Sequence, residues 1–290
     1  MKRMLSHAAQ ASAGAATTTL KPTKTACLTI FHFEGDSMVY NLIQNAQVNL
    51  QHCIDGFDKS IMLKEDFNAV GQTKPTEVLK PNKVIFLNKL VELTNEGYRT
   101  TVRIFTHGKD QAICVNNGLY ITPQDLLDAK KETKHGIFTI DSVYGCHCNG
   151  SSFNKTWIDI GAIVSGGARD TNFYPNQANK FHTEWEKGNV TFKDALKNSD
   201  TESSRTVMQA LIAADAASQL FPKDWDKCPI GSTVLGDKPC AKSYFTARWG
   251  LGNVWQAGKS GKENMNYASD MLVAGQNVTK NTIDTLVWNA

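Results

Sequence analysis

Two residues with the chemistry of a nucleophile and its proton donor follow two apolar segments of the chain. His107 comes after residues 101–106, and Cys146 ends a second apolar segment further along, with one predicted helix between them. A cysteine thiolate can attack a carbonyl carbon while a nearby imidazolium protonates the leaving amine. Parallel strands end at the same edge of a sheet. The pattern therefore predicts a His107–Cys146 dyad in one cleft.

Both residues also have an ordinary structural interpretation. A histidine after a strand can simply lie in a turn, and a cysteine outside a disulfide is among the most buried residue types. Cys148 lies just beyond Cys146 and is the fallback nucleophile. A disulfide between these two cysteines would remove the nucleophile, but so short a loop would be strained.

Metal binding is the competing chemistry for the segment Cys146-His147-Cys148. Zinc ligands this closely spaced usually need a second recognisable pair, and Cys228 and Cys240 lack the spacing of a zinc knuckle. The sequence therefore predicts no metal site. The other histidines of interest are expected at the surface or at helix caps: His32, His52, His135 and His182.

Composition limits the classes of function. The chain has 290 residues, of which 41% are hydrophobic and 20% charged, as in globular proteins with a large core. No stretch approaches the roughly 18 apolar residues of a membrane-spanning helix. Lys and Arg total 31 against 28 Asp and Glu, without a basic cluster, so neither a membrane span nor a nucleic-acid partner is expected.

The cysteines and the first residues bear on the compartment. Cys228 and Cys240 bracket a loop containing Gly and Pro and could form one disulfide, which would favour a secreted or periplasmic protein. The start of the chain is basic but lacks the apolar region of a signal peptide. The localisation is otherwise not indicated.

Alternating strand and helix patterns predict an α/β fold. Strands that are apolar on both faces belong to a mainly parallel sheet with helices on each side. Strands are expected at residues 26–33, 59–67, 101–106, 136–144 and 158–165. Helices are expected at residues 38–54, 84–96, 123–131, 176–187 and 192–197, with Val84, Leu87, Leu90 and Val91 forming one apolar face of the second.

The residues around the two candidates resemble the caspase-like (clan CD) cysteine peptidases, the family of legumain, clostripain and gingipain. Residues 102–108 are similar to the apolar block that ends in His-Gly, and residues 140–148 to the block that ends in Ala-Cys or Gly-Cys. Residues 161–167 are similar to the strand after the nucleophile. A helix, glycine, helix element over residues 181–196 and a turn at 235–239 follow in the same order.

This resemblance covers residues 25–240 and implies a caspase-like three-layer sandwich. It implies a cysteine endopeptidase that hydrolyses peptides or proteins through a thioacyl-enzyme, without a cofactor. The catalytic residues would be His107 and Cys146, and the backbone N–H groups of Gly108 and Cys146 would form the oxyanion hole. Ser165, Arg169 and Asp170 would contact the substrate.

The resemblance leaves several alternatives open. Arg169 would favour an acidic substrate side chain and Asp170 a basic one, and the family favours cleavage after a basic residue. A catalytically inactive caspase-like module, used for binding or regulation, is the alternative function. Maturation of a zymogen by cleavage within residues 198–205 is a further expectation.

Residues 1–24 are expected to be a flexible arm and residues 241–290 an extension packed on the domain, and the oligomeric state is not indicated.

Overall fold

The computed structural model describes the chain in several segments. These are residues 24–32, 50–64, 74–116, 119–168, 177–199 and 278–284, together with the backbone of the short strands at 19–20, 234–235, 238–239, 271–274 and 288–289. The predicted helix at residues 38–54 falls largely outside them. Its last residues form a 3-10 helix, η1 (Leu50–Cys53).

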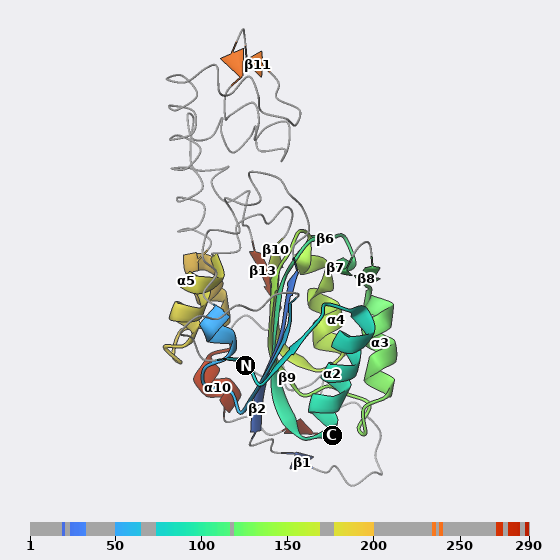
Figure 1. The fold of residues 1–290 in the computed structure, drawn as a ribbon. Helices are drawn as coiled ribbons and strands as arrows, with labels where there is room; N and C mark the ends of the chain where they lie inside the picture. The colour runs from blue at the N-terminus through green and yellow to red at the C-terminus, as the bar shows by residue number, and fades with distance from the viewer. Residues whose placement is uncertain are drawn as a thin grey trace.

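A seven-stranded sheet forms the centre of the molecule (Figure 1). The strands lie in the order β13-β10-β9-β5-β2-β3-β4. Every neighbouring pair is parallel except β10 and β13, which are antiparallel. The bounds are β2 (Lys24–His32), β3 (Lys59–Leu63), β4 (Glu77–Leu79), β5 (Tyr98–Thr106), β9 (Ile140–Cys146), β10 (Ala162–Ala168) and β13 (Met271–Ala274).

Helices cover both faces of this sheet. Figure 1 shows α2 (Lys83–Asn95), α3 (Pro123–Lys131) and α4 (Asn154–Asp159) on one face, and α5 (Gln177–Trp185) and α10 (Lys280–Asp284) on the other. Each face has its own apolar core, one containing Phe86 and Trp157 and the other Phe181 and Ile283. The predicted α/β fold, a three-layer sandwich with a mainly parallel sheet, is confirmed.

Local sequence signals explain the best-predicted helices. Helix α3 begins at Pro123 with a capping box in which the Thr122 hydroxyl accepts from the Asp125 N–H and the Asp125 carboxylate accepts from the Thr122 N–H. Helix α2 starts after the Asn82 cap and ends at Asn95, with Glu96 as its C-cap before Gly97, whose φ is +79°. Its inner face is Phe86, Leu90 and Leu93, so the predicted face was partly wrong: Val84 is 60% exposed.

The predicted strand at residues 158–165 is also partly wrong. Ile158 belongs to α4, and the strand starts only at Ala162. Gly161 makes the change of direction with φ +120°, at a point where a Cβ atom would lie 2.2 Å from the Phe138 carbonyl oxygen. The apolar run therefore spans the end of a helix and the start of a strand.

Several elements were not predicted, among them β4, α4 and α10. Residues after β5 form a small antiparallel sheet of β6 (Gly108–Lys109), β7 (Ala112–Asn116) and β8 (Leu119–Ile121). Strand β13 extends the main sheet from within residues 241–290. Strands β1 (Thr19–Leu20) and β14 (Trp288–Asn289) pair with each other, as do β11 (Val234–Leu235) and β12 (Lys238–Pro239). The domain boundaries stay a prediction.

Among the described residues, no helix has both the length and the apolar character needed to cross a membrane.

Candidate active site

The chain changes direction across the sheet between β2 and β5. From β2 it continues to β3 on one side, whereas from β5 it continues to β9 on the other. In open α/β sheets, such a switch point leaves a crevice beyond the carboxyl ends of the strands, and ligands bind there. His32 and Thr106 are register partners at this edge, and His107 follows directly.

Strand register places Cys146 at the same edge. Cys146 is the last residue of β9 and is the register partner of Phe105 in β5, two residues before His107. Neighbouring strands lie about 4.8 Å apart. The His107 side chain is exposed, whereas Cys146 is 3% exposed. The two predicted catalytic residues thus stand at the ends of adjacent strands.

The small sheet after β5 fixes the backbone of His107. The Cys114 N–H donates to the His107 carbonyl at 2.9 Å, and the Thr106 hydroxyl donates to the Cys114 carbonyl at 2.6 Å. The turn between β6 and β7 then reaches η2 (Gly150–Phe153), because the Gln111 N–H donates to the Ser152 hydroxyl at 2.9 Å. The loop after His107 and the turn after Cys146 are therefore tied together.

Gly108 lies against the segment that follows Cys146. A Cβ atom at Gly108 would lie 2.4 Å from His147 Nδ1 and 2.8 Å from the Cys148 carbonyl oxygen, closer than side chains ever pack. Gly145 is less crowded, since its Cβ would lie 3.3 Å from the Gly166 carbonyl oxygen. The close approach of the two loops requires a glycine at position 108.

His147 has a structural environment. It is 1% exposed, its Nδ1 lies 3.0 Å from the Cys148 carbonyl oxygen, and its ring meets Phe153 edge-on. Burial lowers the pKa of His147 to about 4, against the opposing effect of the hydrogen bond to Cys148. A ring that is neutral at pH 7 cannot serve as an imidazolium donor, so His107 is the better candidate for the general acid.

The other predicted site residues have different positions. Ser165 is 1% exposed, and its hydroxyl donates to the Asn154 side-chain oxygen at 2.8 Å. Cys148 is partly exposed, and both it and Cys146 are thiols. Arg169, Asp170, Cys228 and Cys240 lie outside the described residues. Within the described part of the chain, no group of three or more His, Cys, Asp or Glu side chains could hold a metal ion.

Two histidines expected at the surface are buried. His32 is 6% exposed and His182 is 2% exposed. His32 is the last residue of β2, a strand that is mostly apolar. An apolar run that continues up to a histidine indicates that the histidine is buried, and the expectation of a surface or capping position did not take this signal into account. His52 is partly exposed, with its Nδ1 3.0 Å from a Glu186 carboxylate oxygen.

Comparison with known proteins finds a likeness to a solved structure. No family model matches the chain, and no curated protein matches its sequence. The structure is similar to that of a secreted C11 cysteine protease from Bacteroides thetaiotaomicron, solved with an irreversible peptide inhibitor. The TM-score is 0.31 at 13% identity, over 52% of this chain. The chain matches about half of that protein, 50% of its length.

Proposed function

We propose that the chain is a caspase-like cysteine endopeptidase with Cys146 as the nucleophile and His107 as the general acid and base. The observation that carries the proposal is the register of β5 and β9, which brings the ends of both strands to one edge beside the switch point. The contact of Gly108 with the turn after Cys146 supports it, because this contact holds the two loops close together.

The proposed reaction uses groups that these loops carry. The Cys146 thiolate adds to the scissile carbonyl carbon, and the N–H groups of Gly108 and Cys146 stabilise the oxyanion, each typically contributing about 3–4 kcal/mol. The His107 imidazolium then protonates the leaving amine as the C–N bond breaks. Water, deprotonated by His107, hydrolyses the thioacyl-enzyme and releases the second product.

Hydrolysis of fluorogenic peptides tests this proposal. The panel carries Arg, Lys, Asp or Asn before the scissile bond, and it compares the parent chain with Cys146→Ala, Cys148→Ala and His107→Ala. We expect Cys146→Ala to lower turnover at least about 1,000-fold and Cys148→Ala to leave it within a few-fold. Turnover that survives Cys146→Ala but not Cys148→Ala would transfer the role of nucleophile to Cys148.

The burial of Cys146 favours a second candidate function. With 3% of the residue exposed, a peptide reaches the sulfur only after the atoms covering it move. A catalytically inactive binding module, or a zymogen that needs cleavage, would retain such a covered thiol. A peptide carrying a thiol-reactive group distinguishes these cases, because an active enzyme is labelled at Cys146, a zymogen only after cleavage, and an inactive module in neither state.

A further inference from the structure

A cavity of about 420 Å³ lies away from the candidate active site. Thr25, Arg99 and Asp141 line it, and each stands at or near the amino end of its strand, in β2, β5 and β9. Residues of η1, α5 and α10 form its other walls. Sites for small ligands typically have volumes of about 300–1,000 Å³. The cavity is therefore large enough for a small organic molecule.

Arg103 lines this cavity as a buried charge without an ion-pair partner among the described residues, although Cys27, Cys53 and Glu186 interact with it electrostatically. It is 3% exposed, and its two hydrogen bonds to described residues are long, both from Nη1: 3.3 Å to the Ser142 hydroxyl and 3.4 Å to the Val102 carbonyl. Its Nε has no hydrogen-bond partner among the described residues, and no described carboxylate forms an ion pair with it. A buried charge without a close ion-pair partner is unfavourable because it loses its hydration.

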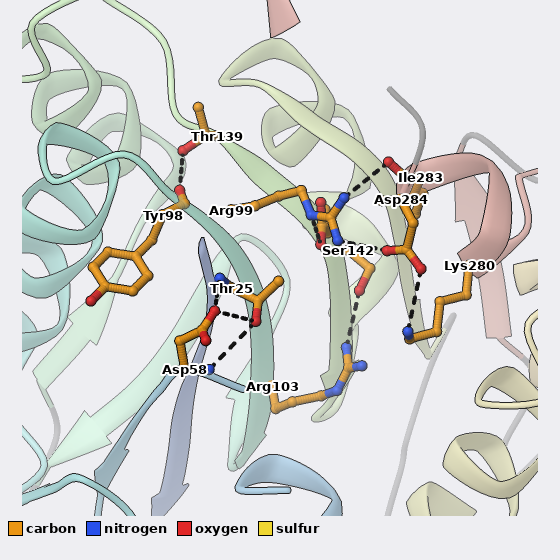
Figure 2. A network of polar contacts seen from close by, with 11 residues as sticks. Thr25, Asp58, Tyr98, Arg99, Arg103, Thr139, Ser142, Lys280, Ile283 and Asp284 are labelled. Carbon is orange, nitrogen blue, oxygen red and sulfur yellow. Dashed lines mark hydrogen bonds and ion pairs between the residues drawn. The ribbon is translucent and has the colours of Figure 1, made fainter. Parts of the chain in front are cut away.

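Arg99, on the same face of β5, has the carboxylate partners that Arg103 lacks. Its Nε lies 2.9 Å from an Asp141 carboxylate oxygen and its Nη2 lies 2.6 Å from Asp284, while Nη1 donates to the Ile283 carbonyl at 3.1 Å. Figure 2 shows both arginine side chains leaving β5 on the side where α10 lies, with acidic partners drawn at Arg99 and only Ser142 at Arg103. Of the two arginines, only Arg103 lacks an ion pair with a described carboxylate, whereas the Nε atoms of both lack a hydrogen bond of good geometry.

A β-bulge turns additional polar groups toward the cavity. Thr100 pairs with Ile140, but the next residue, Thr101, pairs with Ser142, so Asp141 is the extra residue. Asp141 and Ser142, although consecutive, therefore both line the cavity. Bulges that redirect side chains are common beside functional sites.

We infer that this cavity binds a small monocarboxylate, whose carboxylate pairs with the guanidinium of Arg103. A guanidinium presents two parallel N–H donors that match the two oxygens of a carboxylate. Asp55, Glu186 and Asp284 also line the cavity, and because these carboxylates repel every negative charge on a ligand, they disfavour a dianion more than a monoanion. The same charges make a monoanion preferable to inorganic phosphate, which is largely a dianion above neutral pH.

The side-chain N–H of Arg103 gives a direct test by nitrogen–proton NMR of the full chain. Acetate is the first probe, inorganic phosphate the second, and sodium chloride at matched ionic strength the blank. We expect acetate to move the Arg103 Nε–H and Ser142 amide signals saturably, and phosphate to move them less. Arg103→Met should abolish the Ser142 shift, and Arg103→Lys should weaken acetate binding about tenfold because lysine lacks the planar fork.

Lys131→Met is the matched control. It removes the same charge from an exposed position in α3, on the opposite face of the sheet, and should bind acetate as the parent does. Arg103→Met should remain folded, because an apolar side chain of similar length replaces an uncompensated charge. Should it fail to fold, Arg103→Lys carries the test.

Three results would overturn the inference. The first is an acetate response that is the same in Arg103→Met or Arg103→Lys as in the parent, and the second is tighter binding of phosphate than of acetate. The third is no saturable acetate response in the parent chain.

Discussion

At the scale of single residues, the two glycines beside the candidate nucleophile differ in the room around them. A methyl group at Gly108 would overlap His147 Nδ1 and the Cys148 carbonyl oxygen, whereas one at Gly145 would meet neighbours at 3.3 Å. Overpacking of this kind costs about 1–3 kcal/mol. We expect Gly108→Ala to lower the free energy of unfolding by that amount, and Gly145→Ala by less, in urea titrations. Equal losses in the two variants would show that the loops do not meet as described.

Asp141 should titrate near neutral pH. Burial raises the pKa of Asp141 to about 7, and the attraction of Arg99 only partly opposes this. A carbon-detected NMR titration should find its carboxyl midpoint close to 7. Asp58 is the internal control, because hydrogen bonds from the Thr25 N–H and hydroxyl lower its pKa below the ordinary value. An Asp141 midpoint as low as that of Asp58 would contradict the expectation.

The raised pKa of Asp141 also fixes the sign of its effect on stability. Between about pH 4 and pH 7 the folded state holds this proton and the unfolded state does not, so the contribution to stability falls by up to about 1.4 kcal/mol per pH unit as the pH rises. Below pH 4 the contribution is constant. Asp141→Asn should remove this dependence, so the difference in unfolding free energy between parent and variant should change mainly across that interval.

Residue types and spacing were enough to nominate His107 and Cys146, but not Arg103. In the sequence, a buried arginine in a strand cannot be distinguished from any other polar residue in an apolar run. Only the structure shows that no described carboxylate forms an ion pair with Arg103. One signal was present: Arg99, Thr101 and Arg103 alternate with other residues, which places three polar side chains on one face of a central strand. The bulge at Asp141 has no such signal, because it depends on pairing between strands.

At the scale of elements, α10 docks on the sheet through Arg99. The guanidinium bonds to the Ile283 carbonyl and to the Asp284 carboxylate, and Ile283 itself is 2% exposed. We expect Asp284→Ala to cost about 1 kcal/mol, since its side chain is 40% exposed, and to speed hydrogen exchange of the α10 amides. Asp128→Ala removes an exposed pair with Lys131 and should change neither quantity measurably. Unchanged exchange in both variants would contradict this account of how α10 docks.

Elements were predictable where local signals and length agreed. The long apolar strands and α3, with its proline start and capping box, follow from the sequence. The small sheet β6-β7-β8 does not, because its strands are short and their pairing is fixed partly by hydrogen bonds between Cys114 and the end of β5. The run at residues 158–165 failed for a different reason: periodicity alone does not separate a buried helix end from a strand.

At the scale of the whole molecule, the order of the strands decides which residues meet. Sequence order places β9 and β10 after β5, but only the pairing of the strands shows that β2 lies between β5 and β3 and creates the switch point. The same pairing brings β13, late in the chain, to the edge of the sheet beside β10. Alternating apolar segments predict a sheet but not this arrangement, because pairing depends on contacts distant in sequence.

The arrangement makes the last part of the chain necessary for the stability of the rest. A chain that stops after residue 240 loses β13, which pairs with β10, and loses α10, which holds Arg99 and buries Ile283. Losing the Arg99–Asp284 pair costs about 1 kcal/mol, exposing an isoleucine costs about 2 kcal/mol more, and the ladder between β10 and β13 is lost as well. Total stabilities are about 5–15 kcal/mol, so this truncated chain should unfold at far lower urea concentration, or not fold.

The control is a chain that stops after residue 286, which keeps both β13 and α10 and should lose much less stability. Equal stability of the two truncated chains would show that residues 25–240 fold independently of the segment that follows.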